Sequence, residues 1–554
     1  MSHAAISPSD KFAVGLAKSI IQYRWWALLF TFVLVVAAAA GARHLEFSND
    51  YRVFFSAENP ELATFQNLQD TYAKSDTALF VIQAPKEKAF SAELLASIET
   101  LTKKAWQIPY AIRVDSITNF QYSYGEDDDL IVEDLIENAL EMSAEEIQQQ
   151  KFKALSEPLL RGNLISPSAD TVGVSVTLSL PQKSMNEVPA AVKVIRELAA
   201  ELQEQHPDVH IALSGVVMLN NAFGEASLDD MSTLVPMMYG MLIIMALVVL
   251  RSLFGSISTL IVIAFSSIIA MGLAGYMGIP LTPVAAVAPT IIMTLAIADS
   301  IHILVSMLNH LRTGANKNDA IIETLRLNFV PVTLTSLTTM IGFLTLNFSD
   351  APPYWHLGNI TAMGIVAAWL LSLIMLPALL AVLPIKVVAS KQNFRDSDFL
   401  EKIADWVILK RHPILLCGAL LTLALTAMAP TIVLNDEFIK YFDEDIQFRK
   451  DADFTAANLS GVYLVEYSIG AGAPSGIHEY EYLEGLENYT QWLREQNEVK
   501  HVYSYTDIIK RLNRNLHGED PAAYALPKDV EEAAQYLLLY EFSLPYGMDL
   551  TNRV

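Results

Sequence analysis

A carboxylate lies inside a long apolar segment, in the sequence LAIADSIHIL at residues 295–304. Asp299, His302 and Ser306 are spaced i, i+3 and i+7, which places them on one face of a helix. An Asp at the centre of a membrane span costs about 2.5–3.5 kcal/mol on insertion scales, and such residues mark ion or proton paths. We therefore interpret Asp299 as a candidate proton carrier, with His302 and Ser306 beside it in a relay.

Two simpler interpretations remain open. Asp299 could be a neutral, hydrogen-bonded carboxyl that serves packing specificity, and His302 could be a satisfied core histidine. If Asp299 instead alternates between its protonated and ionised forms, each proton that moves down the membrane potential releases about 2.3 kcal/mol per 100 mV. That free energy could be coupled to movement elsewhere in the protein.

A second polar face lies in the following apolar segment, VTLTSLTTMIGFLTL. Thr335, Thr338 and Thr345 share this face with Gly342 at helical spacing. Small and hydroxylic residues let membrane helices pack closely and form hydrogen bonds across the contact. We expect a packing role, and we keep open that these hydroxyls solvate a proton site on the preceding segment.

Seven apolar segments are each long enough to cross a bilayer core of about 30 Å. The 554-residue chain is 52% hydrophobic and yet carries a formal charge of -24, because its apolar and acidic residues lie in different regions. The predicted spans are residues 25–42, 232–250, 254–277, 285–308, 329–348, 357–383 and 413–433. This composition predicts an α-helical polytopic membrane protein with a large water-exposed domain at residues 43–231.

Lys and Arg residues cluster in alternate connections between these segments, whereas GIPLTP and SDAPPYW contain none. The positive-inside rule then predicts a cytoplasmic N-terminus and an external domain at 43–231. No small-residue cleavage pattern follows the first span, which argues against a cleavable signal peptide. The acidic surface argues against a nucleic-acid partner, and the single cysteine, Cys417, cannot form a disulfide within the external domain.

Two stretches of the chain resemble each other at a spacing of 387 residues. KSIIQYRWWALLF corresponds to DWVILKRHPILLC, so that Arg24 aligns with Arg411. An apolar strand candidate follows each copy, DTALFVIQA in the first and GVYLVEYSIGA in the second. Six spans separate the two starts, so both copies enter the membrane in the same direction, as in parallel transporter repeats. We expect the chain to be part of a protein of about 800 residues with twelve spans, rather than an intact seven-span protein.

The external region reads as an α+β domain. Its strand candidates are TALFVIQA, AIRVDSITN, TVGVSVTLSL and VHIALSG, with helical patterns at about 90–106, 131–158 and 187–205. This order predicts a split βαβ, ferredoxin-like unit with a helical insertion after the second strand. The insertion contains the acidic run EDDDLIVEDLIENALEMSAEE, which we interpret as a solvated helix face rather than a cation or partner site.

The predicted organisation follows from these segments. It comprises a cytoplasmic interfacial helix (1–24), the first span (25–42), external domain 1 (43–231), a bundle of spans two to six (232–384), a cytoplasmic linker with an interfacial helix (385–412), the seventh span (413–433) and a partial external domain 2 (434–554).

The chain resembles the RND superfamily of transporters, and within it the MMPL-like exporters, which are related to lipid and hopanoid transporters and to Patched-type sterol-sensing proteins. The resemblance is carried by Asp299 in the fourth span and by the amphipathic stretch NHLRTGANKNDAIIETLRLN that follows it. Two further features carry the resemblance: the Thr-rich fifth span, which ends in GFLTL, and the sixth span, which ends in LPALLAVLP. It implies porter-type external domains and a sterol-sensing-type bundle at 232–384.

The resemblance also implies export driven by the proton-motive force, with Asp299 as the proton carrier and protons as the coupling ion. No other cofactor, no metal and no catalytic residue are expected. Two features depart from the family. Many members have Gly-x-x-x-Asp-Tyr here, whereas Ser300 replaces the tyrosine in this chain, so we assign Ser300 to the relay in its place. Members also usually have an acidic counterpart in a tenth span, which these residues do not reach.

The expected partners are a hydrophobic or lipid-like substrate, membrane lipids and further copies of the chain in a dimer or trimer. The expected location is a bacterial inner membrane. A lipid-binding sensor without pumping activity and a protein-export accessory factor are alternatives. An intramembrane aspartyl protease would need two carboxylates that share one site, and Asp299 is the only acid in the middle of a predicted span.

Overall fold

The computed structural model describes residues 7–48, 50–72, 76–86, 88–126, 129–181, 184, 186–385, 395–433, 437–461 and 463–550. The sequence also predicts an Asn-Asp turn in each copy of the repeat, and Asn49, Asn435 and Asp436 of these turns lie outside the described residues. The chain divides into two compact units, and each is described by itself. One comprises Met1–Ser48 and Ser227–Phe438, and the other comprises Asn49–Ala226 and Ile439–Val554.

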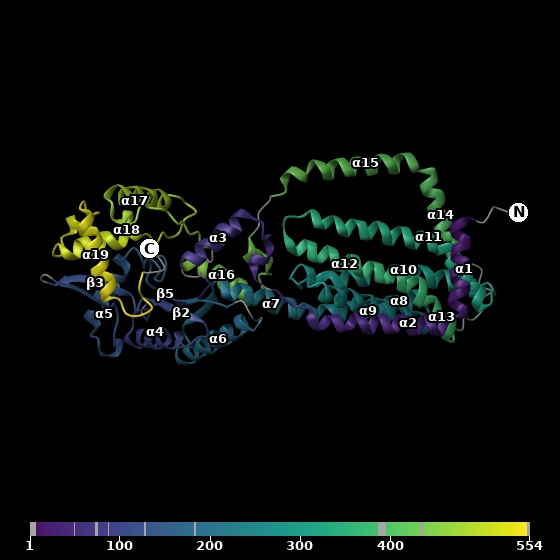
Figure 1. The fold of residues 1–554 in the computed structure, drawn as a ribbon, viewed down its shortest axis with the longest axis horizontal. Coiled ribbons are helices and arrows are strands. Elements are labelled where there is room, and N and C mark those ends of the chain that lie inside the picture. Colours follow the sequence, from purple (N-terminus) through teal and green to yellow (C-terminus); the bar gives the residue numbers. More distant parts are fainter. Residues whose placement is uncertain are drawn as a thin grey trace. The chain divides into compact units, whose positions relative to one another are not determined.

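The first unit is helical (Figure 1). Its helices are α1 (Pro8–Gln22), α2 (Arg24–Ala39), α8 (Leu234–Leu250), α9 (Leu253–Tyr276), α10 (Ala288–Arg312), α11 (Lys317–Leu344), α12 (Pro352–Leu370), α13 (Leu376–Val382), α14 (Arg395–Leu409) and α15 (Arg411–Ala427). We call this part the membrane unit. Helix α7 (Val216–Ser232) runs across the boundary between the two units.

Seven helical stretches within the described residues are long and apolar enough to cross a membrane, which confirms the seven predicted spans. They are Arg24–His44, Val216–Leu250, Leu253–Tyr276, Ala285–Arg312, Lys317–Phe348, Pro352–Val382 and Arg411–Thr431. The second stretch begins before the predicted residue 232, because helix α7 leads into α8 after only a short break. The fifth also begins earlier than predicted, because the polar residues after Lys317 already form the first turns of α11.

Helices α9, α10 and α12 pack against one another and form the centre of the membrane unit. A Cβ atom on Gly364 would lie only 2.2 Å from Cδ1 of Ile292, so glycine is required for α12 to approach α10 this closely. The amphipathic helix α1 packs against α11, where Phe12 contacts Phe329 at a ring-centroid distance of 5.4 Å. In contrast, no residue of α15 is buried.

The second unit contains a four-stranded antiparallel sheet, and we call this part the external unit. Its strands are β1 (Asp76–Gln83), β2 (Ala111–Ser116), β5 (Thr171–Leu178) and β6 (His210–Ser214), in the order β2-β5-β1-β6. Helix α4 (Ala92–Ala105) follows β1, and α6 (Glu187–Gln205) follows β5. The two strand-helix-strand passages interleave in one sheet, which is the predicted split βαβ arrangement.

The insertion after β2 differs from its prediction. Residues 129–134 form strand β4 (Asp129–Asp134), which pairs with β3 (Gln121–Glu126) in a hairpin, and helix α5 begins only at Ala144 and ends at Ser156. The predicted helix at 131–158 is therefore wrong at its start. The reason is local: Leu130 and Val132 on β4 pack against an apolar cluster, while a capping box at Ser143 starts the helix.

The repeat appears as helices at matching positions. Helices α3 (Pro60–Thr71), α4 and α5 have counterparts in α16 (Gln447–Asn458), α17 (Tyr480–Arg494) and α19 (Val530–Ser543). Helix α18 (Tyr505–Leu516) has no helical counterpart in the first copy. The strand predicted at 461–471 is not formed in its described residues, although the matching segment of the first copy is the central strand β1. None of the described strands pairs with residues 463–471, so this segment forms no β-ladder hydrogen bonds with them.

Candidate functional site

Asp299 lies on α10, in the middle of the candidate span Ala285–Arg312. Asp299 is only 9% exposed, so its carboxyl group is buried within a largely apolar helix. Buried neighbours on the same helix are Ala296, Ile303 and Leu304, which belong to the main apolar cluster of the membrane unit. Asp299 therefore faces the interior of the helix bundle, as a functional intramembrane acid is expected to do.

Ser336 on α11 is the hydrogen-bond partner of this carboxyl. Its Oγ donates to Oδ2 of Asp299 at 3.1 Å, and the serine is 7% exposed. The sequence interpretation missed this residue, although it lies within the same hydroxyl-rich run. The sequence did contain a sign of it, because Ser336 is the one residue of VTLTSLTTM that is a serine among threonines. Thr335, Thr338 and Thr345, which were predicted instead, lie on the neighbouring face of the helix.

The predicted relay residues on α10 are arranged differently around Asp299. His302 is exposed and close enough for an electrostatic interaction with Asp299. Ser306 is half-buried, and Ser300 is fully buried with no hydrogen-bond partner for its Oγ within the described residues. Among these residues, no hydrogen bond joins Asp299 to any of the three. The structure brings His302 near the carboxyl, while relay roles for all three remain predictions.

The predicted threonine face of α11 does not surround Asp299. Thr335, Thr338 and Thr345 are exposed, and each hydroxyl donates to carbonyl groups of its own helix. The exposed apolar residues Leu334 and Ile341 lie on the same helix. Successive residues of a helix are rotated by about 100° because 3.6 residues make one turn, so Ser336 faces the bundle while Thr335 does not.

No ion pair holds Asp299 within the part of the chain that the structure describes. The carboxyl accepts a hydrogen bond from a neutral hydroxyl, and no Lys or Arg among the described residues lies within ion-pair distance of it. A permanent cationic partner would keep the carboxyl ionised, whereas a hydroxyl can accept or donate and so suits either protonation state. The described residues also contain no cluster of His, Cys, Asp and Glu that could hold a metal ion.

The comparisons with known proteins agree with this architecture. The model of the MMPL family matches residues 62–409, which is more than half of the chain. The chain belongs to the MMPL family. A relative from Methanocaldococcus jannaschii, named "Putative membrane protein MJ1562", is 21% identical over 365 residues, which is 64% of this chain and 89% of that protein.

Membership of the MMPL family establishes the broad class. The chain is a multi-pass membrane protein of a transporter family in the RND superfamily, in agreement with its seven apolar helices. MMPL proteins are transporters rather than enzymes. The matched residues 62–409 include both Asp299 and Ser336.

Proposed function

We propose that this chain is an exporter that uses the proton-motive force to move hydrophobic or amphiphilic, lipid-like molecules. One observation carries the proposal: Asp299 is buried among membrane helices with a hydroxyl, and no Lys or Arg, as its partner in the described residues. A carboxyl in that setting can gain and lose a proton, because neither form is fixed by a permanent charge. Binding from one side and release to the other would couple proton entry to helix movement.

Each residue near the carboxyl has a proposed part in the cycle. The Ser336 hydroxyl orients the Asp299 carboxyl and can accept a hydrogen bond when the carboxyl is protonated. His302, which is exposed and electrostatically coupled to Asp299, passes protons to and from it. Ser300 and Ser306 extend this path along α10. Protons are the only coupling ion that the proposal requires.

The external unit supplies the route for the substrate in this proposal. Its split βαβ sheet suits a porter-type domain, in which movement between repeats opens and closes a path. We place the protein in a bacterial inner membrane, with a cytoplasmic N-terminus and the external unit in the periplasm. This orientation rests on the distribution of Lys and Arg between the loops.

Reconstituted transport tests the proton carrier. In proteoliposomes with an imposed pH gradient, a fluorescent phospholipid and a pH-sensitive dye report substrate movement and proton flux together. Asp299→Asn keeps the size and the acceptor oxygen but cannot be ionised, so both signals should fall to those of empty liposomes. Asp350→Asn, in an exposed loop between α11 and α12, is the matched control and should behave as the wild type.

Two results would overturn the proposal. Unchanged proton flux in Asp299→Asn would exclude this carboxyl as the carrier. Tight phospholipid binding without movement in the wild type, at any pH gradient, would favour a lipid sensor of the same architecture. A circular dichroism spectrum and elution profile that match the wild type are needed for the Asn variant, so that loss of transport is not loss of folding.

A further inference from the structure

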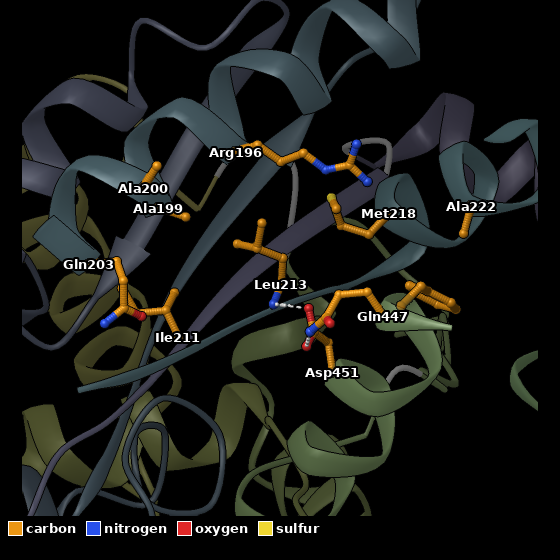
Figure 2. Close-up of a pocket in the computed structure, with 11 residues that line it drawn as sticks. Arg196, Ala199, Ala200, Gln203, Ile211, Leu213, Met218, Ala222, Gln447 and Asp451 are labelled. Carbon is orange, nitrogen blue, oxygen red and sulfur yellow. Dashed lines mark hydrogen bonds between the residues drawn. The ribbon is translucent and has the colours of Figure 1, made fainter. Parts of the chain in front are cut away.

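The external unit contains a cavity of about 290 Å³ between α6, β6, α7 and α16 (Figure 2). Apolar side chains form much of its wall, from residues Ala199, Leu213, Met218, Ala222 and Phe448. The volume lies at the lower end of the range of about 300–1,000 Å³ that is typical of small-molecule sites.

Asp451 lies at one end of this cavity and is 7% exposed. Its Oδ2 accepts from the backbone N–H of Leu213 at 3.0 Å, and its Oδ1 accepts from Nε2 of Gln447 at 2.7 Å. Both partners are neutral, and no Lys or Arg forms an ion pair with Asp451 in the described residues. A buried carboxylate without a cation is costly, and burial accordingly raises the pKa of Asp451.

The guanidinium group in the cavity wall compensates this carboxylate only in part, by an electrostatic interaction without a hydrogen bond or ion pair between the two side chains in the described residues. Arg196 on α6 is half-exposed and donates to both carboxylate oxygens of Glu225, at 2.6 and 2.8 Å. His210, the other basic group near Asp451, packs its ring edge-on against Phe454 at 4.6 Å. The Arg196 hydrogen bonds go to Glu225, and the cavity combines apolar walls with a carboxylate that no direct ion pair compensates within the described residues.

We propose that this cavity binds an aliphatic ammonium compound, with its alkyl chain against the apolar wall and its N–H groups donating to Asp451. Each carboxylate oxygen already accepts one hydrogen bond and has a second acceptor site free. An ammonium group would supply both the missing positive charge and the additional donors, in a charge-assisted hydrogen bond. The site is distinct from Asp299, and its occupation requires no proton gradient. It can therefore exist whether or not the proposed transport does.

Binding of three probes with the same chain length tests the chemistry. The probes are 6,6,6-trifluorohexylamine, the matching alcohol and the matching carboxylate, followed by ¹⁹F NMR on the full chain in lipid nanodiscs, with empty nanodiscs subtracted. We expect the amine to bind at least tenfold more tightly than the alcohol, and the carboxylate not to bind. Equal binding of amine and carboxylate would overturn the assignment.

Two variants locate the binding in this cavity. Asp451→Asn should remove the tenfold preference for the amine while the alcohol still binds. Ala200→Trp should block the binding of both, because Ala200 lines the cavity and is itself exposed, so a larger side chain there does not disturb the core. Asp453→Asn and Ala190→Trp are the matched controls, since both residues are exposed on the same two helices and outside the cavity wall.

Each outcome tests the proposed ammonium site in the cavity and not the proposed transport function. An amine preference that persists in Asp451→Asn would refute the role of the carboxylate, and full binding by Ala200→Trp would place the probe elsewhere. If Asp451→Asn does not fold, Ala200→Trp still decides the location and the three probes still decide the charge. Asp299→Asn should bind the amine as the wild type does, which separates this inference from the proposed proton carrier.

Discussion

Replacing Arg511 by Met should destabilise the external unit strongly. Arg511 on α18 is 2% exposed, and its Nη1 donates to Oε2 of Glu157 at 3.0 Å. Its Nη2 donates to the hydroxyl of Tyr540 at 3.0 Å, and its guanidinium carbon lies 5.3 Å from the ring centroid of Phe120. The ion pair therefore joins a residue that follows α5 in the first copy of the repeat to α18 in the second.

The size of the effect follows from the burial of both charges. Met removes the cation and leaves the Glu157 carboxylate, which is 6% exposed, with the backbone N–H of Leu159 as a hydrogen-bond donor but without its cationic partner. Breaking a buried pair in this way costs about 3–5 kcal/mol. Removing both charges in Arg511→Met/Glu157→Met should recover part of this loss, because apolar residues of similar size can replace a buried ion pair at little net cost. The double variant should therefore be more stable than Arg511→Met.

Hydrogen exchange followed by mass spectrometry measures this change within α17–α19 of the full chain. Each 1.4 kcal/mol corresponds to a tenfold change, so amides of α18 should exchange about 10²- to 4 × 10³-fold faster in Arg511→Met. Lys88→Met is the control, because Lys88 pairs with Asp208 at the surface, where both side chains are exposed and an ion pair contributes little to stability. A change of less than tenfold in Arg511→Met, or a double variant no more protected than the single one, would refute the reasoning.

Two further predictions concern single side chains. Ser336→Ala should slow proton-coupled transport several-fold in the proteoliposome assay, because the Asp299 carboxyl loses the hydrogen-bond donor at 3.1 Å that orients it. Thr338→Ala should have no effect in the same assay, because Thr338 is exposed. Equal rates in the two variants would contradict this role for Ser336. Burial lowers the pKa of His501, and Nε2 of its ring lies 2.9 Å from the carbonyl oxygen of Pro158. The neutral imidazole therefore stabilises the folded state fully above the pKa of His in the unfolded chain, about 6.5. This stabilisation is lost as the pH falls through the lower pKa of His501 in the folded protein. Thermal unfolding between pH 7.5 and 5 should therefore show a decline that is smaller in His501→Gln, and an identical slope in the variant would exclude His501 as its source.

Much of the external unit could be predicted because local patterns and global topology agree there. Alternating strands with intervening helices gave the split βαβ order, and α6 has the predicted bounds of 187–205. The hairpin formed by β3 and β4 was missed because its acidic run resembles a solvated helix in composition. Its strand character depends on cross-strand pairing, such as Tyr124 with Ile131, which a single segment does not reveal.

The repeat shows the same limit. Helices α16, α17 and α19 lie about 387 residues after α3, α4 and α5, because amphipathic helices complete their backbone hydrogen bonds locally. The apolar segment at 463–471 did not become a strand, because strand formation requires a neighbouring strand and none of the described residues supplies one. The pattern of one segment can therefore specify a helix by itself. A β-strand also needs a partner strand, which the pattern of that segment does not specify.

The sequence by itself determined the seven spans and the position of Asp299 within one of them. Long apolar runs have few alternatives to a membrane helix, and a lone carboxyl in such a run is conspicuous because its burial is costly. Only the tertiary structure decided which side chain meets that carboxyl. Residues 335 and 336 have similar hydroxyls, and the rotation of α11 against α10 directs Ser336 inward and Thr335 outward. Packing between helices sets that rotation, and it depends on contacts that are distant in sequence.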